Sequence, residues 1–306
     1  MVNILVTGGC GFIGSNLVDE LIKLEYKVHV IDDLSTGLKE NCNNSANYYF
    51  IDILDFLHST KEVKKILEEN SCDVLYHLAA LVDVRKTIDD PLLAYNINSL
   101  ATHVLSEISI EFGIKKIIFA STSAVYGEPN YFPVDEEHET SPISPYGLSK
   151  LCAEQSLKYL SKLKKLDVFV FRLPNVYGPR QRPDLEGGVI SIFYEKMKKR
   201  QPVSFFGDGQ QTRDWVHVSD IVEALTLALS KNGLGYQLIS LGSGKASSLI
   251  ELYNYMSNEL NYDLDPIIGE PREGDIKHMV MLANRAKRII DWKAKIGLKM
   301  GIRMLA

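Results

Sequence analysis

The chain has 306 residues, 45% of them hydrophobic, which is enough to bury roughly three quarters of its surface in one large domain or two modest ones. Its net charge of −5 offers no basic face for nucleic acid, and no apolar run approaches the ~20 residues of a membrane span or forms a signal peptide. The four cysteines lack C-x-x-C spacing and the seven histidines lack ligand spacing, so we expect reduced thiols, a cytoplasmic location and no metal site.

The first predicted unit is a strand, a glycine-rich turn and a helix. Residues 3–6 have the length and apolar content of a short buried strand, and apolar residues recur with helical spacing from Phe12 onward. The turn between them contains Gly8, Gly11 and Gly14. Glycine lets a phosphate approach the backbone N–H groups and the positive end of the helix dipole. The unit therefore predicts a pyrophosphate site, with a bare tight turn as the alternative because the spacing differs from G-x-G-x-x-G.

A second predicted strand, residues 27–31, ends in the acids Asp32 and Asp33. An acid about 20 residues beyond a glycine turn can hydrogen-bond the ribose hydroxyls of an adenine dinucleotide. Its charge also repels a 2′-phosphate, and no arginine follows before Gly37. These residues favour NAD over NADP. The alternative role for Asp32 is a helix or turn cap.

The rest of the first 180 residues alternates strand and helix. We expect strands near residues 48–50, 74–77, 116–120 and 167–172, and helices near 60–69, 91–112 and 145–162. This alternation predicts an α/β fold with a Rossmann-type doubly wound parallel sheet. Ligands bind at the carboxyl ends of such strands, which places several segments on one rim: Asp52 and residues 78–80, 121–123 and 174–175.

The regular alternation of predicted strands and helices ends at Gly178. Shorter and less regular elements follow, with helices expected near residues 190–199 and 219–230. We therefore divide the chain into residues 1–178, an NAD-binding Rossmann domain, and residues 179–306, a smaller substrate-binding lobe that is interleaved with the sheet. The chain stops at Ala306, soon after a helix expected near Gly297, so the completeness of the C-terminus stays open.

Tyr146 and Lys150 lie four residues apart near the start of a predicted helix, so both side chains point to the same face. Bringing a phenol from a pKa near 10 to neutrality takes about 4 kcal/mol, and an ammonium about 5 Å away supplies about 3 kcal/mol at an effective dielectric near 20. Tyr194 and Lys198 form a second pair with this spacing. Position separates the two pairs, because Tyr146 can reach the rim that carries Thr122. For Tyr194 we expect a packed or surface tyrosine.

The hydroxyl cluster at residues 121–123 follows directly after the strand that ends at residue 120. A hydroxyl at this place can hydrogen-bond both a substrate alcohol and the tyrosine oxygen. The alternative is a Ser/Thr turn motif without a catalytic part.

The motifs of the chain resemble those of the extended short-chain dehydrogenase/reductases. Five of them occur in the family's order at residues 7–14 (Thr-Gly-Gly-x-Gly-x-x-Gly), 32–37 (Asp-Asp-Leu-Ser-Thr-Gly), 77–80 (His-Leu-Ala-Ala), 121–127 (Ser-Thr-Ser-Ala-Val-Tyr-Gly) and 146–150 (Tyr-Gly-Leu-Ser-Lys). Three more, at residues 172–180, 206–220 and 272–275, are similar to those of the NAD-dependent nucleotide-sugar epimerases of the UDP-glucose (UDP-galactose) 4-epimerase type. The resemblance covers nearly the whole chain.

Carried over residue by residue, the resemblance implies a site for NAD and a site for a UDP-sugar. The cofactor residues it implies are Gly8, Gly11, Phe12, Ile13, Gly14, Asp32, Asp33, Ser35, Thr36, Gly37, Asp52, Ile53, Leu78, Ala79, Ala80, Asn98, Tyr146 and Lys150. The substrate residues it implies are Thr122, Asn175, Gly188, Val189, Phe206, Arg213, Arg272 and Asp275. The catalytic residues it implies are Thr122, Tyr146 and Lys150. For Arg213 and Arg272 the alternative is a structural ion pair.

The resemblance implies a reversible C4 epimerisation of a UDP-hexose, glucose/galactose or an N-acetyl form, through a transient 4-keto sugar with bound NAD. Tyr146 would remove the 4-hydroxyl proton, Thr122 would hydrogen-bond the oxygen, and Lys150 would hold the tyrosine's charge. A nucleotide-sugar 4,6-dehydratase or decarboxylase shares the first oxidation, but dehydratases carry a carboxylate pair where this chain has Ser123 and Ala124. A non-enzymatic NAD-sensing or scaffold protein on the same fold is the alternative of another class.

The chain departs from the family pattern at five positions, which are Val82, Asp83, Ala101, Pro174 and Met279. Met279 stands where epimerases use a large tyrosine or a small cysteine to gate sugars with or without an N-acetyl group, so the accepted sugar stays open, as does the resting redox state of the NAD. The resemblance also implies a homodimer formed through the helices near residues 91–112 and 145–162.

Overall fold

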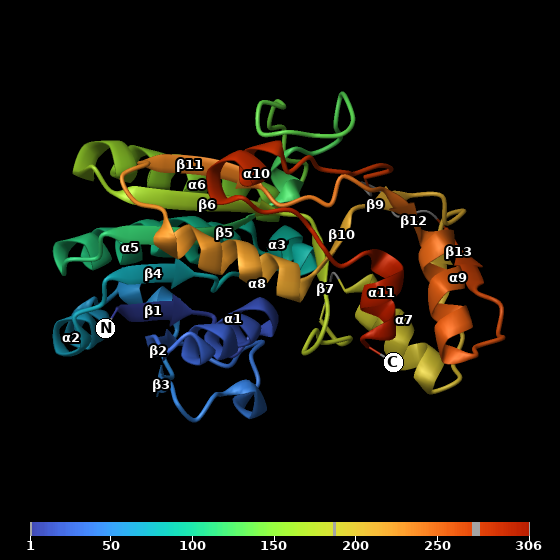
Figure 1. The fold of residues 1–306 in the computed structure, drawn as a ribbon, viewed down its shortest axis with the longest axis horizontal. Coiled ribbons are helices and arrows are strands. Elements are labelled where there is room, and N and C mark those ends of the chain that lie inside the picture. The colour runs from blue at the N-terminus through green and yellow to red at the C-terminus, as the bar shows by residue number, and fades with distance from the viewer. Residues whose placement is uncertain (1, 186–187, 271–275, 306) are drawn as a thin grey trace.

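A seven-stranded parallel sheet forms the centre of the computed structural model, which describes residues 2–185, 188–270 and 276–305. The strand order is β11-β6-β5-β4-β1-β2-β3 (Figure 1). The strands are β1 Asn3–Thr7, β2 Lys27–Ile31, β3 Asn47–Tyr49, β4 Val74–His77, β5 Lys116–Thr122, β6 Asp167–Leu173 and β11 Tyr236–Ser240. All neighbouring pairs in this sheet are parallel, so the predicted α/β fold with a doubly wound parallel sheet is confirmed.

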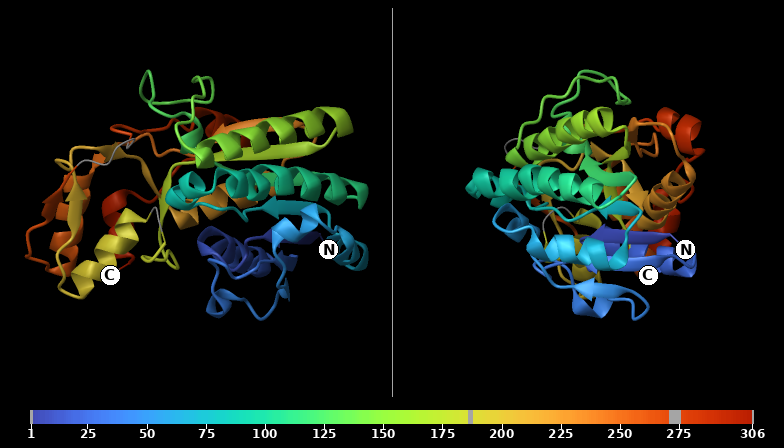
Figure 2. Two further views of the ribbon diagram at one scale, coloured as in Figure 1. Left: turned by 180° about the vertical axis from the view of Figure 1, so that it is seen from behind. Right: turned by 90° about the vertical axis from the view of Figure 1, so that its left-hand side faces the viewer.

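Helices cover both faces of the sheet, because alternate residues of each buried strand point to opposite sides (Figure 2). On β1, Ile4 and Val6 join one hydrophobic core and Leu5 joins the other. The first core lies beneath α1 Phe12–Lys23, α8 Val218–Leu227 and α10 Asn284–Ile290. The second lies beneath α2 Lys61–Asn70, α5 Ala101–Glu111 and α6 Pro145–Lys164.

The helix predicted over residues 91–112 is interrupted. The structure has α4 Pro91–Tyr95, a π-helical turn at Asn96–Leu100 and then α5, and it adds a short unpredicted helix, α3 Val84–Asp89. Single π turns inside α-helices occur often at functional sites. This turn carries Asn98, a predicted cofactor residue, so the interruption lies where the sequence places a function.

The strand β11 was not predicted, although it completes the central sheet beside β6. Its sequence, Tyr-Gln-Leu-Ile-Ser, mixes polar and apolar residues. This composition fits its place at the edge of the sheet, where it has only one neighbouring strand. The chain therefore returns to the sheet more than fifty residues after Gly178. The division of the chain at residue 178 stays a prediction.

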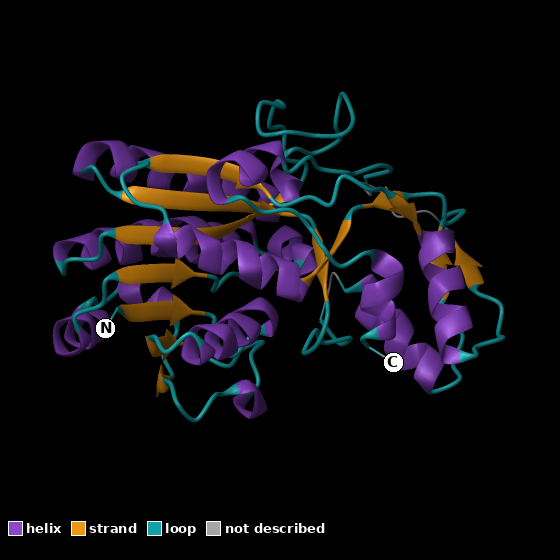
Figure 3. Ribbon diagram, viewed as in Figure 1, coloured by secondary structure: helices purple, strands orange, loops and turns teal. Residues whose placement is uncertain are grey.

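A second group of elements lies beyond the carboxyl ends of the sheet strands, toward which their arrowheads point (Figure 3). It consists of β7 Asn175–Tyr177, α7 Val189–Lys198, β8 Ser204–Phe206, β9 Thr212–Arg213, β10 Trp215–His217, β12 Ser247–Ser248, α9 Leu249–Leu260, β13 Ile267–Gly269 and α11 Leu298–Arg303. These strands form three two-stranded sheets. A separate hydrophobic core, which includes Phe193, Phe205 and Leu252, holds the group together.

None of the helices in the described ranges has both the length and the apolar character needed to cross a membrane.

Candidate active site

The glycine turn after β1 contains positions at which no other residue would fit. Gly8 has a φ of +72°, and a Cβ there would lie 2.7 Å from the backbone nitrogen of Ala79. A Cβ on Gly14 would lie 2.0 Å from the Gly8 carbonyl oxygen, so α1 packs directly on the turn. Gly11 is the N-cap of α1 and offers no capping side chain. The first N–H groups of this 12-residue helix are therefore suited to a phosphate, as NAD requires.

Asp32 lies beside this turn at the end of β2 and is almost fully buried. Its carboxylate accepts hydrogen bonds from the backbone N–H of Cys10 at 2.8 Å and of Leu34 at 2.9 Å. Burial raises the pKa of this carboxyl, whereas the two N–H donors lower it. Each oxygen keeps a further lone pair, so Asp32 can still accept from a ribose hydroxyl. A Cβ on Gly37 would lie 2.8 Å from Asp32 Oδ1, so this wall of the site requires glycine.

Two further acids of the predicted set shape the backbone around them. Asp33 Oδ1 accepts from the backbone N–H and the hydroxyl of Ser35 at 2.9 and 2.7 Å. Asp52 Oδ1 accepts from the N–H of Leu54 at 2.8 Å and caps the turn that contains the buried Ile53. Their contacts with a cofactor stay predictions.

Asn98 joins the segment after β4 to α6. Its side-chain amide donates to the Leu81 carbonyl and to Ser149 Oγ, both at 3.0 Å, and its Oδ1 accepts from the Leu81 N–H at 2.8 Å. Asn98 is fully buried, and its two hydrogen bonds with Leu81 hold the end of the segment 78–80, which is the predicted cofactor wall. The same wall is held from the other side by Thr7 Oγ1, which accepts from the N–H groups of Leu78 and Ala79.

Thr122 and Tyr146 meet at the carboxyl end of β5. Helix α6 begins at Pro145 with Ser144 as its N-cap. A Cβ on Gly147 would lie 2.5 Å from the Ala124 carbonyl oxygen, so only glycine lets α6 approach the turn after Thr122 this closely. The pKa of the partly buried Tyr146 is raised by burial and lowered by a hydrogen bond with Thr122.

Lys150 lies one helical turn further and is 2% exposed. Its Nζ is 4.2 Å from the centroid of the Phe119 ring. Burial lowers the pKa of Lys150 to about 7, and the charge of Glu154 raises it. We expected Lys150 to bring Tyr146 most of the way to a neutral pKa. Burial raises the pKa of Tyr146 more than the hydrogen bond with Thr122 lowers it, so the protein's side chains alone hold Tyr146 as the phenol.

A histidine that the sequence analysis left without a role connects these elements. His77 Nδ1 lies 2.6 Å from Thr7 Oγ1 and Nε2 lies 2.8 Å from Thr102 Oγ1. Since Thr102 donates its proton to the Asn98 carbonyl, its oxygen accepts from Nε2, and Nδ1 accepts from Thr7. Burial lowers the pKa of His77 to about 3, and the charge of Lys150 lowers it further. A neutral His77 with a fixed tautomer therefore lies behind the site.

The predicted substrate residues within the described ranges lie mainly in the second group of elements. Asn175 begins β7, and its N–H donates to the carbonyl of Asp214, the residue that follows Arg213, at 3.1 Å. Gly188 and Val189 begin α7, and Phe206 ends β8. Arg213 donates to the Thr212 carbonyl at 3.0 Å. Arg272 and Asp275 lie outside the described residues.

The segment after β7 reaches across to α1 and to the loop after β2, which the sequence analysis did not foresee. The Asn16 amide donates to the Pro179 carbonyl at 3.2 Å, and Arg180 forms an ion pair with Asp19 at 2.6 Å. Arg182 donates to the Thr36 carbonyl at 3.0 Å. Residues 179–182 therefore tie the second group of elements to α1 and to the loop of the predicted adenosine site. Contacts between such distant residues have no periodic pattern in the sequence.

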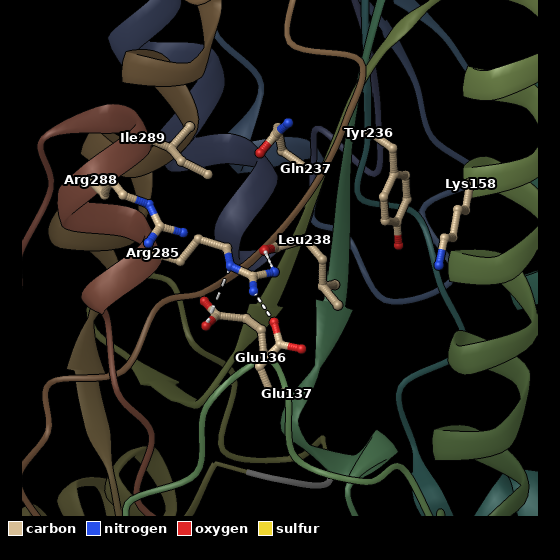
Figure 4. Close-up of a pocket in the computed structure, with 9 residues that line it drawn as sticks. All are labelled: Glu136, Glu137, Lys158, Tyr236, Gln237, Leu238, Arg285, Arg288 and Ile289. Carbon is tan, nitrogen blue, oxygen red and sulfur yellow. Dashed lines mark hydrogen bonds and ion pairs between the residues drawn. The ribbon is translucent and has the colours of Figure 1, made fainter.

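A separate pocket contains no predicted site residue (Figure 4). It is lined by Glu136, Glu137, Lys158, Tyr236, Gln237, Leu238, Arg285, Arg288 and Ile289. Arg285 forms ion pairs there with both glutamates. Within the described ranges, no group of three or more His, Cys, Asp or Glu side chains is arranged to hold a metal ion.

Comparison with known proteins identifies relatives along nearly the whole chain. Residues 4–242 match the model of the NAD dependent epimerase/dehydratase family. The UDP-glucose 4-epimerase of Mycolicibacterium smegmatis is 35% identical over 304 residues, which are 97% of this chain and 95% of that protein.

Solved structures agree with this match. A UDP-glucose 4-epimerase from Thermotoga maritima, solved with UDP-glucose, superposes with a TM-score of 0.94 at 37% identity and covers 99% of this chain and 97% of its own. A UDP-glucose 4-epimerase from Thermus thermophilus, solved with NAD, superposes with a TM-score of 0.90 at 32% identity, with coverage of 99% and 97%. The chain is therefore similar to epimerases in both sequence and fold.

Proposed function

The chain belongs to the NAD dependent epimerase/dehydratase family, and from this premise we propose that it is an NAD-dependent UDP-sugar 4-epimerase. The reaction is the reversible interconversion of UDP-glucose and UDP-galactose, or of their N-acetyl forms. The observation that carries the proposal is the meeting of Thr122 and Tyr146 at the carboxyl end of β5, with Lys150 buried one helical turn beyond them. This end of the sheet also carries the glycine turn that fits a pyrophosphate.

The residues of the glycine turn fit NAD, because Gly8 and Gly14 leave room that a Cβ would fill and Asp32 keeps lone pairs for a ribose. The chemistry that NAD supplies when bound is reversible hydride acceptance, by which the sugar is oxidised at C4 and reduced again. The protein supplies orientation and proton transfer.

Three side chains carry the proton chemistry in this proposal. Tyr146 takes the proton from the sugar's 4-hydroxyl and returns it after the 4-keto sugar has presented its other face. Thr122 hydrogen-bonds the reacting oxygen and the tyrosine, which lowers the pKa of Tyr146. Lys150 compensates the negative charge of the tyrosinate from behind. The burial that raises the pKa of Tyr146 would be offset by the positive charge that oxidised NAD would supply when bound.

We assign the UDP-sugar contacts to the lobe formed by residues 179–306 together with Asn175. Arginine suits a diphosphate because its guanidinium donates in a planar fork, and Arg213 directly precedes Asp214, whose carbonyl accepts from the Asn175 N–H. Met279, which the resemblance puts at the sugar gate, is buried in a cluster with Val125 and Tyr126.

We further propose a homodimer, supported by apolar side chains on the outer surfaces of the helices that the sequence assigned to it. Leu92, Leu100 and Tyr159 are exposed to 69%, 48% and 61%. A dimer formed through these helices would remove these apolar side chains from water. Light scattering tests this proposal, with a dimer expected for the wild type and a monomer for Leu100→Arg. A wild-type monomer at micromolar concentration contradicts it.

We place the enzyme in the cytoplasm on the state of its thiols. Its four cysteines are free, although Cys10 Sγ and Cys42 Sγ lie only 3.4 Å apart. A reducing compartment keeps such thiols unpaired.

The direct experiment is product analysis after incubation with UDP-galactose and, in parallel, UDP-N-acetylgalactosamine, with no added reductant. Conversion to the C4 epimer supports the proposal and identifies the accepted sugar. A 4-keto-6-deoxy product indicates a dehydratase instead, and the absence of any product despite bound NAD indicates a sensor or scaffold.

A further inference from the structure

A buried carboxylate behind Lys150 connects three elements of the active site. Glu154 follows Lys150 by one turn on α6 and is fully buried. Its Oε1 accepts from Ser121 Oγ at 2.5 Å and from Arg172 Nε at 3.0 Å, and its Oε2 accepts from an Arg172 terminal nitrogen at 2.7 Å. Glu154 therefore joins α6 to β5 through Ser121 and to β6 through Arg172.

Of the four elements packed against Lys150, two bring charged side chains toward it and two do not. His77 on β4 is neutral, since its pKa is lowered to about 3 by burial, and Phe119 on β5 offers only its ring. On α6, Tyr146 is held as the phenol by burial, and Glu154 carries a negative charge that raises the pKa of Lys150. On β6, Arg172 is paired with Glu154 in a bidentate contact.

The buried charges around Lys150 cancel when Tyr146 is a tyrosinate, which is its form in the reacting state. With Tyr146 as the phenol, the buried cations Lys150 and Arg172 face one anion, Glu154. When Tyr146 gives up its proton, two cations face two anions, and the group becomes neutral. Removing the charge of Glu154 leaves two buried cations without an anion, and the less costly response is loss of the Lys150 proton.

Building on the proposed function, we propose that Glu154 is a positioning residue for epimerisation: its buried carboxylate fixes α6 against β5 and β6 and keeps the positive charge on Lys150. Ser121, one of its donors, directly precedes Thr122 on β5. The same carboxylate therefore sets the strand end that presents Thr122 and the charge that supports Tyr146.

The test is an NMR titration of the Lys150 amine in the purified protein labelled with ¹³C at the lysine side chains. The Lys150 signal is assigned by its loss in Lys150→Arg. In Glu154→Gln we expect its midpoint to fall by about one pH unit or more, because an opposite charge one turn away is removed. Glu136→Gln is the matched control, since the side chain of Glu136 is only 4% exposed but accepts from the Ser240 N–H instead. An unchanged Lys150 midpoint in folded Glu154→Gln overturns the proposal.

A second variant tests the opposite sign and does not depend on the folding of the first. Arg172→Met removes the competing cation, so Glu154 acts on Lys150 alone and the midpoint of Lys150 should rise. A midpoint that stays unchanged or falls in folded Arg172→Met contradicts the proposal.

The kinetic consequence follows from the same charges. In Glu154→Gln we expect kcat to fall about tenfold or more and the alkaline limb of its pH profile to move to lower pH, because Lys150 loses its proton earlier, with recovery of that limb in Glu154→Asp. A change in KM alone, with the kcat profile unmoved, indicates a merely structural role and overturns the proposal. Absence of epimerisation in the wild type overturns the proposed function, whereas the NMR titrations still decide the role of Glu154.

Discussion

Two tyrosine–lysine pairs with the same spacing lie in this molecule in opposite surroundings. On α7, exposed Lys198 donates to the Tyr194 hydroxyl at 3.3 Å and lies 5.0 Å from the centre of its ring, while that hydroxyl donates to the Leu305 carbonyl. On α6, Lys150 is buried against Phe119 and acted on by Glu154, and Tyr146 meets Thr122. The exposed pair makes the more direct contact between its two side chains.

The difference shows that helical spacing brings a phenol and an ammonium together but does not make a site. The pair on α7 serves to bind the C-terminal segment, through the hydrogen bond from Tyr194 to Leu305. The pair on α6 has shifted pKa values, a hydroxyl partner on β5 and a glycine turn at the same end of the sheet. Perturbed groups that gather at one rim are candidates for function.

The largest effect is expected for Tyr146→Phe. Loss of the phenol removes the proton acceptor, so kcat with UDP-galactose should fall by about 10³-fold or more, while NAD remains bound. Product analysis together with the NAD content of the purified variant checks both statements. Activity within tenfold of the wild type would show that the pair on α6 is no more catalytic than the pair on α7.

Removing the partner on β5 should have the next largest effect. Thr122→Val deletes the hydrogen bond that lowers the pKa of Tyr146, and kcat should fall by about 10²-fold. Thr122→Ser keeps a hydroxyl and serves as the control, with activity near that of the wild type. Equal losses in both variants would contradict the role of the hydroxyl.

The buried Lys150 should also make the free energy of unfolding depend on pH. Its folded pKa of about 7 lies below the ordinary value of 10.5, so the unfolded chain binds more protons between these pH values. Lys150 therefore makes the free energy of unfolding rise as pH increases from 7 to 10, by at most about 1.4 kcal/mol per pH unit. Denaturant titrations across this range should show a shallower rise in Lys150→Met. An unchanged rise would contradict the lowered pKa of the buried Lys150.

The smallest effect is expected for Tyr194→Phe, the counterpart on α7. Epimerisation should stay within about twofold of the wild type, and the lost hydrogen bond to Leu305 should cost about 1 kcal/mol of stability. Kinetics and denaturant titration measure the two quantities. A large loss of activity would remove the distinction between the two pairs.

The parts of the fold that the sequence predicted are those with local causes. The strands β1, β2 and β4 are short, mainly apolar segments that are buried on both faces, and their predicted bounds agree with the structure to within one residue. The glycine turn and Asp32 were recognisable because their spacing along the chain follows from one strand–turn–helix unit. The edge strand β11 was missed because Tyr236, Gln237 and Ser240 break the apolar run that marks the other strands.

The parts of the site that the sequence could not predict depend on contacts between distant residues. The pairing of Glu154 with Arg172, and that of Thr7 with His77, join different strands and helices. Neither pair has a periodic pattern, since each side chain is placed by the packing of the sheet. Likewise, the lowered pKa of Lys150 comes from burial, which the four-residue spacing does not reveal.

The measurement that tests the account most directly is the fate of deuterium at C4. UDP-galactose labelled with deuterium at C4 is incubated with the purified protein, without added reductant, and the products are analysed by NMR and mass spectrometry. The account predicts UDP-glucose that retains the label at C4, because oxidation and reduction occur at that carbon within one site. Loss of the label to water, or a product changed at C6, would contradict C4 epimerisation by Tyr146 and bound NAD.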